Sequence, residues 1–157
     1  MATVAALLQE GMAQLRESSD SARVDVEILL CHLLGKPRSF LFTWPEHEVP
    51  ASQVQQFFDW LAQRRDGTPV AYLTGRREFY GHDFFVSPDT LIPRADTETL
   101  VDAVLARLPE AQPLRIADLG TGTGAIAISL ALARPHWQVE AVDFSVAILD
   151  LVPVSYT

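Results

Sequence analysis

The sequence has little cysteine and no long apolar runs. Its single cysteine, Cys31, excludes an internal disulfide framework, and its apolar helical context, EILLCHLLG, predicts a buried thiol that packs as a small hydrophobe. No apolar run approaches the roughly 18 residues that cross a bilayer, so no membrane partner is expected. The stretch MATVAALLQEGMAQLRESSD lacks the basic start and continuous apolar run of a signal peptide, so a cytoplasmic location is expected.

Positive charge is also scarce. Twelve lysine and arginine residues stand against 20 aspartate and glutamate residues, which gives a net charge of −8 and a pI near 4.8. Tight nonspecific binding to nucleic acid needs many cations that neutralise phosphates, so this balance argues against a nucleic-acid partner. The hydrophobic content of 48% suffices for a core, and an acidic protein of this kind is expected to bind a small ligand or another protein.

Two further kinds of site are disfavoured by what is missing. The four histidines are scattered and show no metal-ligand spacing, so no metal site is expected. No lysine follows the glycine-rich stretch GTGTG in P-loop order, which excludes that phosphate-binding motif.

The three tryptophans are expected to be packing residues: Trp44, Trp60 and Trp137.

The first half of the chain, residues 1–74, predicts a small bundle of helices. Three segments, 3–18, 19–35 and 51–67, carry apolar residues at helical spacing. The second begins with the capping residues Ser19 to Ser21, carries Val24 and Ile28 among its apolar residues, and ends at Gly35. The intervening KPRSFLFTWPEHEVP predicts a proline-punctuated connection whose aromatic rings pack on the helices.

Residues 75–95 predict a β-hairpin linker. REFYGHDFFV is typical of two short strands around a turn, placed at Gly81 and His82. ADTETLVDAVLARLP then predicts a helix with Asp96 or Thr97 as its N-cap and Pro109 beyond its end.

Residues 96–157 are expected to begin an α/β domain. After Pro113 the order is strand, loop, helix, strand, in the segments LRIADLG, TGTG, AIAISLALARP and WQVEAVD. That order is the opening βαβ unit of a parallel, doubly wound sheet of Rossmann type.

The loop between the first strand and its helix holds three glycines: Gly120, Gly122 and Gly124. Glycine permits positive φ and lets a ligand approach the main chain, while the helix start offers N–H groups and the positive end of its dipole. A tight turn without a ligand is the alternative, but three glycines at this spacing favour a ligand. Gly120, Gly122 and Ala125 fit the dinucleotide fingerprint, so a dinucleotide-binding oxidoreductase fragment stays an alternative.

Two acids flank this loop. Asp118 would repel a pyrophosphate, whereas it would attract the ammonium and sulfonium groups of S-adenosylmethionine. S-adenosylmethionine is the cofactor of class I methyltransferases, and the stretch DLGTGTG resembles the first motif of those enzymes. Asp118 could instead cap nearby backbone N–H groups. Asp143 ends the second strand, where a carboxylate can accept both hydroxyls of a ribose, cap the following helix, or do both.

Taken together, these motifs resemble the HemK/PrmC family, the release factor glutamine methyltransferases. The resemblance runs from about Ala22 to Asp143 through DVEILLCHLLG, RRDGTPVAYLTGRREFYGHDFFVSPDTLIPR, ADTETLV and DLGTGTGAIAISLA, in that order. It implies a helical N-terminal domain that docks a release factor, a hairpin connection, and a methyltransferase domain. It also implies transfer of a methyl group from S-adenosylmethionine to the glutamine amide nitrogen of the Gly-Gly-Gln motif of release factors.

The resemblance also implies roles for single positions. The cofactor loop of the family matches Gly120, Thr121, Gly122, Thr123 and Gly124, and its ribose-binding acid matches Asp143. The LIPR segment, residues 91–94, matches a stretch near the active site. Arg94 and Glu98 are therefore candidate catalytic residues, although a salt bridge or a helix N-terminal charge explains them equally well.

The chain departs from the family pattern in two places. Ala95 stands where the family usually has proline, and the Asn-Pro-Pro-Tyr motif that holds the acceptor amide is absent. After Asp143 comes FSVAILDLVPVSYT, an apolar run in which Pro153 would break a helix. We therefore expect a truncated or altered form of a longer enzyme, inactive in transfer. A non-catalytic module that binds a release factor is the alternative, and the oligomeric state stays open.

Overall fold

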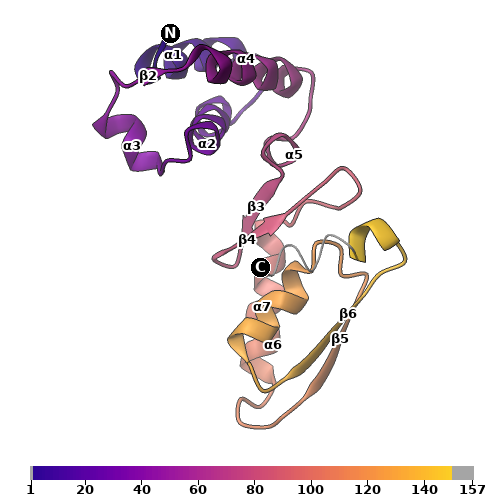
Figure 1. Ribbon diagram of the computed structural model, residues 1–157. Helices are drawn as coiled ribbons and strands as arrows, with labels where there is room; N and C mark the ends of the chain where they lie inside the picture. The colour runs from indigo at the N-terminus through magenta and orange to yellow at the C-terminus, as the bar shows by residue number, and fades with distance from the viewer. Residues whose placement is uncertain (1, 150–157) are drawn as a thin grey trace. The chain divides into compact units, whose positions relative to one another are not determined.

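The computed structural model describes residues 2–149, which divide into two compact units between Thr74 and Gly75 (Figure 1). Each unit has its own buried cluster of apolar side chains. Within residues 2–149, no helix is long and apolar enough to cross a membrane. Pro153, which we expect to break a helix, lies outside the described residues.

The first unit contains the three predicted helices and two short ones that the apolar spacing does not predict. Its elements are β1 (Ala2–Thr3), α1 (Val4–Leu15), α2 (Ala22–Leu34), α3 (Arg38–Thr43), β2 (Glu48–Val49), α4 (Ala51–Arg65) and α5 (Val70–Thr74). The two strands pair antiparallel. Both short helices, α3 and α5, follow a proline directly, Pro37 and Pro69, whose fixed φ suits a helix start. Within the predicted connection of residues 36–50, Pro37 therefore marks the start of a short helix.

The core of the first unit lies where α1, α2 and α4 meet. Gly11 of α1 lets the helices approach closely, since a Cβ atom there would lie 2.9 Å from Phe57 Cζ and 2.9 Å from Val26 Cγ1. Leu29 and Leu61 are fully buried around this contact. The apolar spacing that predicts a helix over 51–67 is thus confirmed at the centre of α4, where Phe57 and Leu61 are buried.

The predicted apolar face of α2 is wrong in part. Val24 and Ile28 are 52% and 41% exposed, whereas Asp25 and Glu27 are buried. The two acids turn inward because arginines neutralise them; Asp25 pairs with Arg64 at 2.8 Å.

The expectation that the aromatic rings of residues 36–50 pack on the helices also fails at two positions. Phe42 is 51% exposed and Trp44 is 60% exposed. Leu41 alone fills the inward position of α3. Trp137, by contrast, is buried in the second unit as predicted.

The second unit begins with the hairpin and continues into the βαβ unit. Its elements are β3 (Arg76–Phe79), β4 (His82–Phe85), the 3-10 turn η1 (Ala95–Thr97), α6 (Glu98–Arg107), β5 (Arg115–Leu119), α7 (Ala125–Ala133) and β6 (Gln138–Val142). β5 and β6 pair in parallel with Leu119 opposite Val142. The predicted strand, glycine loop, helix and strand are confirmed.

The hairpin turn lies one residue earlier than predicted, at Tyr80 and Gly81, and His82 belongs to β4. A two-residue turn that follows the twist of the strands needs positive φ at both positions, which are +50° at Tyr80 and +77° at Gly81. Tyrosine rarely adopts this conformation. It is held there because Glu98 Oε1 accepts the Tyr80 N–H at 2.8 Å and Asp102 Oδ1 accepts the Tyr80 hydroxyl at 2.7 Å.

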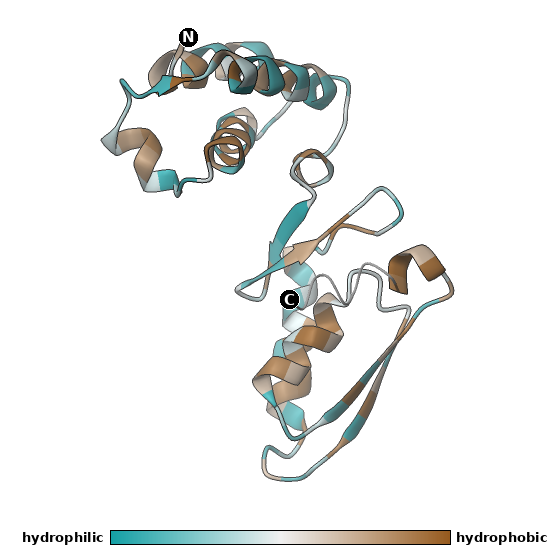
Figure 2. Ribbon diagram, in the orientation of Figure 1, coloured by the Kyte–Doolittle hydropathy of each residue, from teal (hydrophilic) through white to brown (hydrophobic). Residues whose placement is uncertain are grey.

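The sheet of the second unit is covered on one side. Burial alternates along both strands, so Ile116 and Val139 pack into the apolar cluster while Leu119 and Val142 are 78% and 47% exposed. α7 is apolar except for Ser129 (Figure 2), which suits a helix packed into the core. Because β5 and β6 run parallel, their carboxyl ends meet at one edge of the sheet, and the glycine loop follows β5 at that edge.

Candidate cofactor-binding site

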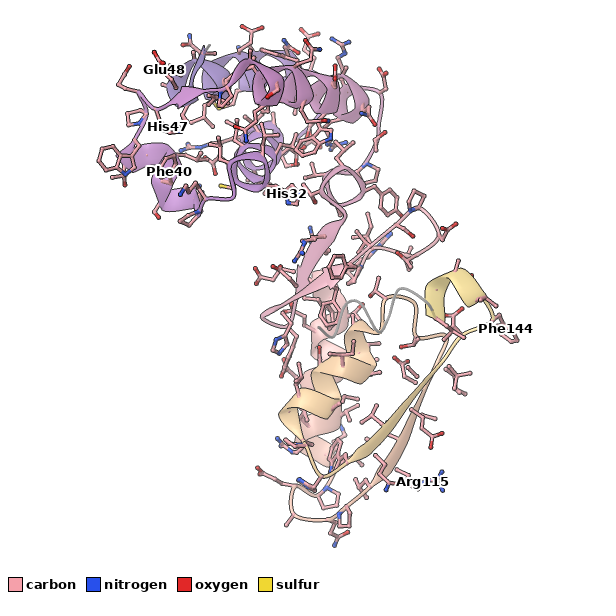
Figure 3. All side chains as sticks on the ribbon, viewed as in Figure 1. His32, Phe40, His47, Glu48, Arg115 and Phe144 are labelled. Atoms are coloured by element: carbon pink, nitrogen blue, oxygen red, sulfur yellow. The ribbon has the colours of Figure 1, made fainter. Side chains whose placement is uncertain are left out.

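The glycine loop is fixed to the end of β6. The N–H groups of Gly120 and Thr121 both donate to the carbonyl of Val142, at 2.8 and 3.0 Å. In Figure 3, Phe144 marks this edge of the sheet and Arg115 marks the opposite end of the strands. This is the edge at which ligands bind in open parallel sheets.

All three glycines adopt the conformation for which the sequence analysis expects them. Their φ angles are +78° at Gly120, +57° at Gly122 and +79° at Gly124. A Cβ atom at Gly120 or Gly122 would meet nothing within 4 Å, so the main chain is open to a ligand there. Gly124 caps the N-terminus of α7, and its carbonyl accepts the N–H of Ile128 at 2.8 Å.

Asp143 connects the end of β6 to the loop. Its Oδ2 accepts the N–H of Gly122 at 3.1 Å, and its Oδ1 accepts the N–H of Ser145 at 3.1 Å. The hydrogen bonds from the main chain of Ser145 and then of Gly122 hold the pKa of Asp143 below its ordinary value. Asp143 is therefore a charged, oriented carboxylate, and its bond to Ser145 begins the helical turn of residues 146–149.

Asp118 lies on the half-buried face of β5 and bonds within the loop. Its Oδ2 accepts the hydroxyl of Thr121 at 2.8 Å. The partner of Asp118 is thus a side-chain hydroxyl rather than the backbone N–H groups of the alternative interpretation. Thr121 and Thr123 are both buried, at 8% and 2% exposure. The spacing of three residues between Asp118 and Thr121 is the signal that could have revealed this bond.

Phe144 is a residue that the sequence analysis did not identify. It follows Asp143 directly, and its side chain is fully exposed at 106% (Figure 3). An exposed aromatic ring beside an oriented carboxylate offers an apolar surface to a ligand that the carboxylate binds. The signal in the sequence is an aromatic residue immediately after the acid that ends a strand.

The two catalytic candidates lie in different surroundings. Glu98 accepts the N–H of Tyr80 and so holds the hairpin turn. The exposed side chain of Arg94 has no hydrogen bond or ion pair within residues 2–149. Their catalytic roles stay predictions. The same described range contains no group of three or more side chains that could hold a metal ion.

Comparison with known proteins agrees with this arrangement. The PrmC N-terminal domain family matches residues 6–75, and the methyltransferase small domain family matches residues 95–154. A release factor glutamine methyltransferase of Escherichia coli (strain K12) is 54% identical over 136 residues, which cover 87% of this chain and 48% of the relative. The chain carries a PrmC N-terminal domain followed by a methyltransferase small domain. A release factor glutamine methyltransferase of Pseudomonas aeruginosa is 53% identical over 143 residues, covering 91% of this chain and 50% of the relative.

A more distant relative, from Coxiella burnetii, is 43% identical over 142 residues and covers 90% of this chain and 51% of the relative. All three of these relatives carry the name release factor glutamine methyltransferase. The chain spans about half the length of the curated relatives it matches.

Proposed function

We propose that this chain carries the S-adenosylmethionine-binding part of a methyltransferase that acts on the glutamine of release factors. The observation that carries the proposal is the loop of residues 120–124, whose open main chain is tied to the carboxylate of Asp143. The names of the relatives add the substrate class, and the Gly-Gly-Gln glutamine is the acceptor that the family resemblance implies. A cytoplasmic location is the expectation that accompanies this function.

The residues at this edge fit the chemistry of the cofactor. S-adenosylmethionine supplies an activated methyl group on a sulfonium when it is bound. In our proposal Asp143 accepts the ribose hydroxyls and Phe144 packs against the base. The carboxylate of Asp118 provides the negative charge that a sulfonium and an ammonium favour and that a pyrophosphate would oppose. For that reason we prefer this cofactor to a dinucleotide.

Methyl transfer needs a second part that holds the acceptor. An amide nitrogen is a poor nucleophile because its lone pair is delocalised into the carbonyl, so positioning of the glutamine supplies much of the catalysis. The family uses an Asn-Pro-Pro-Tyr motif for this, and these 157 residues do not contain it. We therefore expect the 157 residues by themselves to bind the cofactor without transferring its methyl group.

The arrangement of the chain gives each part a role in the proposal. Residues 1–74 dock the release factor, and residues 96–157 begin the methyltransferase domain. Residues 75–95 connect these two domains. A second candidate function, a module that binds a release factor without catalysis, is favoured by the exposed aromatic residues of the first unit.

Isothermal titration of the chain with S-adenosylmethionine, NAD and a release factor tests these assignments. We expect binding of S-adenosylmethionine and of the release factor, and none of NAD. Binding of the release factor alone would favour the non-catalytic module, and binding of NAD alone would contradict the proposal. Incubation with labelled S-adenosylmethionine and a release factor checks the expectation that the 157 residues do not transfer the methyl group. Transfer of label to the release factor would refute that expectation.

A further inference from the structure

Helices α2 and α3 of the first unit carry exposed apolar side chains and two exposed arginines. Val24 and Ile28 lie one turn apart on α2 and are 52% and 41% exposed, and Phe42 of α3 is 51% exposed. The side chains of Arg23 on α2 and Arg38 on α3 are 66% and 65% exposed. We call these five residues the α2–α3 face. The apolar character of α2 and α3 is visible in Figure 2.

A buried carboxylate holds the two helices of this face together. Glu27 is only 4% exposed, its Oε1 accepts Arg23 Nε at 3.0 Å, and its Oε2 accepts Arg38 Nε at 2.6 Å. Burial by itself would raise the pKa of Glu27, but the hydrogen bonds from Arg38 and Arg23 hold it below its ordinary value. Because a buried carboxylate without these partners would be costly, Glu27 fixes α3 against α2.

The exposed ring of Phe42 is part of an ordered segment. Arg38 Cζ lies 5.7 Å from the centroid of the Phe42 ring, a cation–π contact. The ring of Phe40, also in α3, packs edge-on against His47, which lies beyond the end of the helix, with centroids 5.2 Å apart (Figure 3). The carbonyl of His47 accepts the N–H of Val4 in α1 at 3.0 Å. The segment that presents Phe42 is therefore anchored at both ends.

The charge of the face is opposite to that of the chain. Arg23 and Arg38 against Glu27 leave one positive charge, whereas the chain carries −8. Both contacts to Glu27 use Nε, and within residues 2–149 the Nη groups of these two arginines make no hydrogen bond. A guanidinium presents its remaining N–H groups as a fork that matches a carboxylate. Arginine and aromatic residues are also enriched among the few residues that supply most of the binding energy at protein–protein interfaces.

We propose that the α2–α3 face docks an acidic surface of the release factor. Carboxylates of that protein pair with Arg23 and Arg38, and an apolar side chain between them covers Phe42 and Ile28. This assignment rests on the proposed function, which names the release factor as the partner. The strong negative charge of the chain disfavours a nucleic acid as the occupant of this face.

The test compares the affinity of the release factor for the wild-type chain and for two variants. Phe42→Ala removes the exposed ring, and Arg23→Ala removes one guanidinium while Glu27 keeps Arg38. Both changes alter exposed side chains, so both variants should retain the far-UV circular dichroism of the wild type. Arg65→Ala, an exposed arginine in the last turn of α4, is the matched control. We expect a rise in Kd of about tenfold or more for Phe42→Ala and a smaller rise for Arg23→Ala.

A second readout separates this inference from the proposed function. Binding of S-adenosylmethionine to the same variants should stay at the wild-type affinity. If the wild type binds the release factor and both variants bind it equally well, the face is wrong and the proposed function stands. If the wild type binds neither the release factor nor the cofactor, the proposed function fails. Binding to tRNA or anionic vesicles that the two variants abolish, with release factor binding unchanged, would also overturn the docking proposal.

Discussion

At the residue scale, the proposed cofactor site depends most on Asp143. Its two oxygens accept main-chain N–H groups of Gly122 and Ser145, so the carboxylate both shapes the loop and faces the proposed ribose. We expect Asp143→Asn to raise the Kd of S-adenosylmethionine about tenfold or more, because an amide has one acceptor oxygen where the carboxylate has two. Equilibrium dialysis measures this affinity. Asp102→Asn, at an acid of the hairpin contact, is the control and should leave the affinity unchanged.

The pH dependence of the same residue has a definite sign. Main-chain hydrogen bonds lower the pKa of Asp143 in the folded chain, so its contribution to the loop is complete above the ordinary value of about 3.9. That contribution is lost as the pH falls through the lowered value. We expect cofactor affinity to stay flat from pH 8 to pH 5 and to fall only below about pH 4. Loss of affinity near pH 6 would contradict this assignment.

Gly11 makes a prediction about stability at the same scale. A methyl group there would lie within 3.0 Å of the side chains of Phe57 and Val26, both of which are fully buried. We expect Gly11→Ala to destabilise the first unit by about 1–3 kcal/mol from overpacking, offset by up to about 1 kcal/mol from better helix propensity. Urea denaturation measures the sum. Ala6→Gly, at an exposed position of α1, isolates the propensity effect, and a stabilised Gly11→Ala would contradict the tight packing.

At the scale of elements, the hairpin turn depends on an acid from α6. Glu98 accepts the N–H of Tyr80, the tyrosine whose φ is positive. We expect Glu98→Ala to speed hydrogen exchange at the Tyr80 amide about tenfold, whereas Glu98→Gln, which keeps an acceptor oxygen, should preserve most of the protection. Unchanged exchange in Glu98→Ala would show that the contact does not hold the turn, and would leave the catalytic reading of Glu98 as the stronger one.

The elements also show what the sequence could predict. Periodicity located α1, α4 and the βαβ unit, because long segments with a single buried face carry a strong repeat. It also located α2 but did not predict which face of α2 is buried, because burial of Asp25 and Glu27 depends on arginines distant in sequence, Arg64 and Arg38. The position of the hairpin turn could not be predicted either, since its tyrosine is stabilised by a side chain 18 residues away.

The candidate site was more predictable than the fold around it. The positive φ of the three glycines and the edge position of Asp143 follow from strand order and from the conformational freedom of glycine alone. The hydrogen bond from Thr121 to Asp118 and the exposed ring of Phe144 did not, because both depend on how the loop folds back on the end of β6. Local rules therefore predicted the main chain of the site, and tertiary contacts determined its side chains.

At the scale of the whole molecule, the described residues leave one face of the parallel pair β5–β6 exposed. Parallel strands are normally covered on both faces, and here Leu119 and Val142 lie opposite each other and uncovered. Exposed apolar surface of this kind drives association in water. We expect the 157-residue chain to self-associate as its concentration rises, and the double variant Leu119→Thr, Val142→Thr to do so less, because threonine keeps β propensity while adding a hydroxyl.

Sedimentation velocity over a series of concentrations checks this prediction. Leu108→Thr, which changes a leucine of 38% exposure at the end of α6, is the matched control and should associate like the wild type. A wild type that stays monomeric throughout the series would contradict the prediction. The double variant Leu119→Thr, Val142→Thr can also be tested for S-adenosylmethionine binding. If it associates less than the wild type but binds the cofactor equally well, the exposed face and the glycine loop act independently, although both are built on the same two strands.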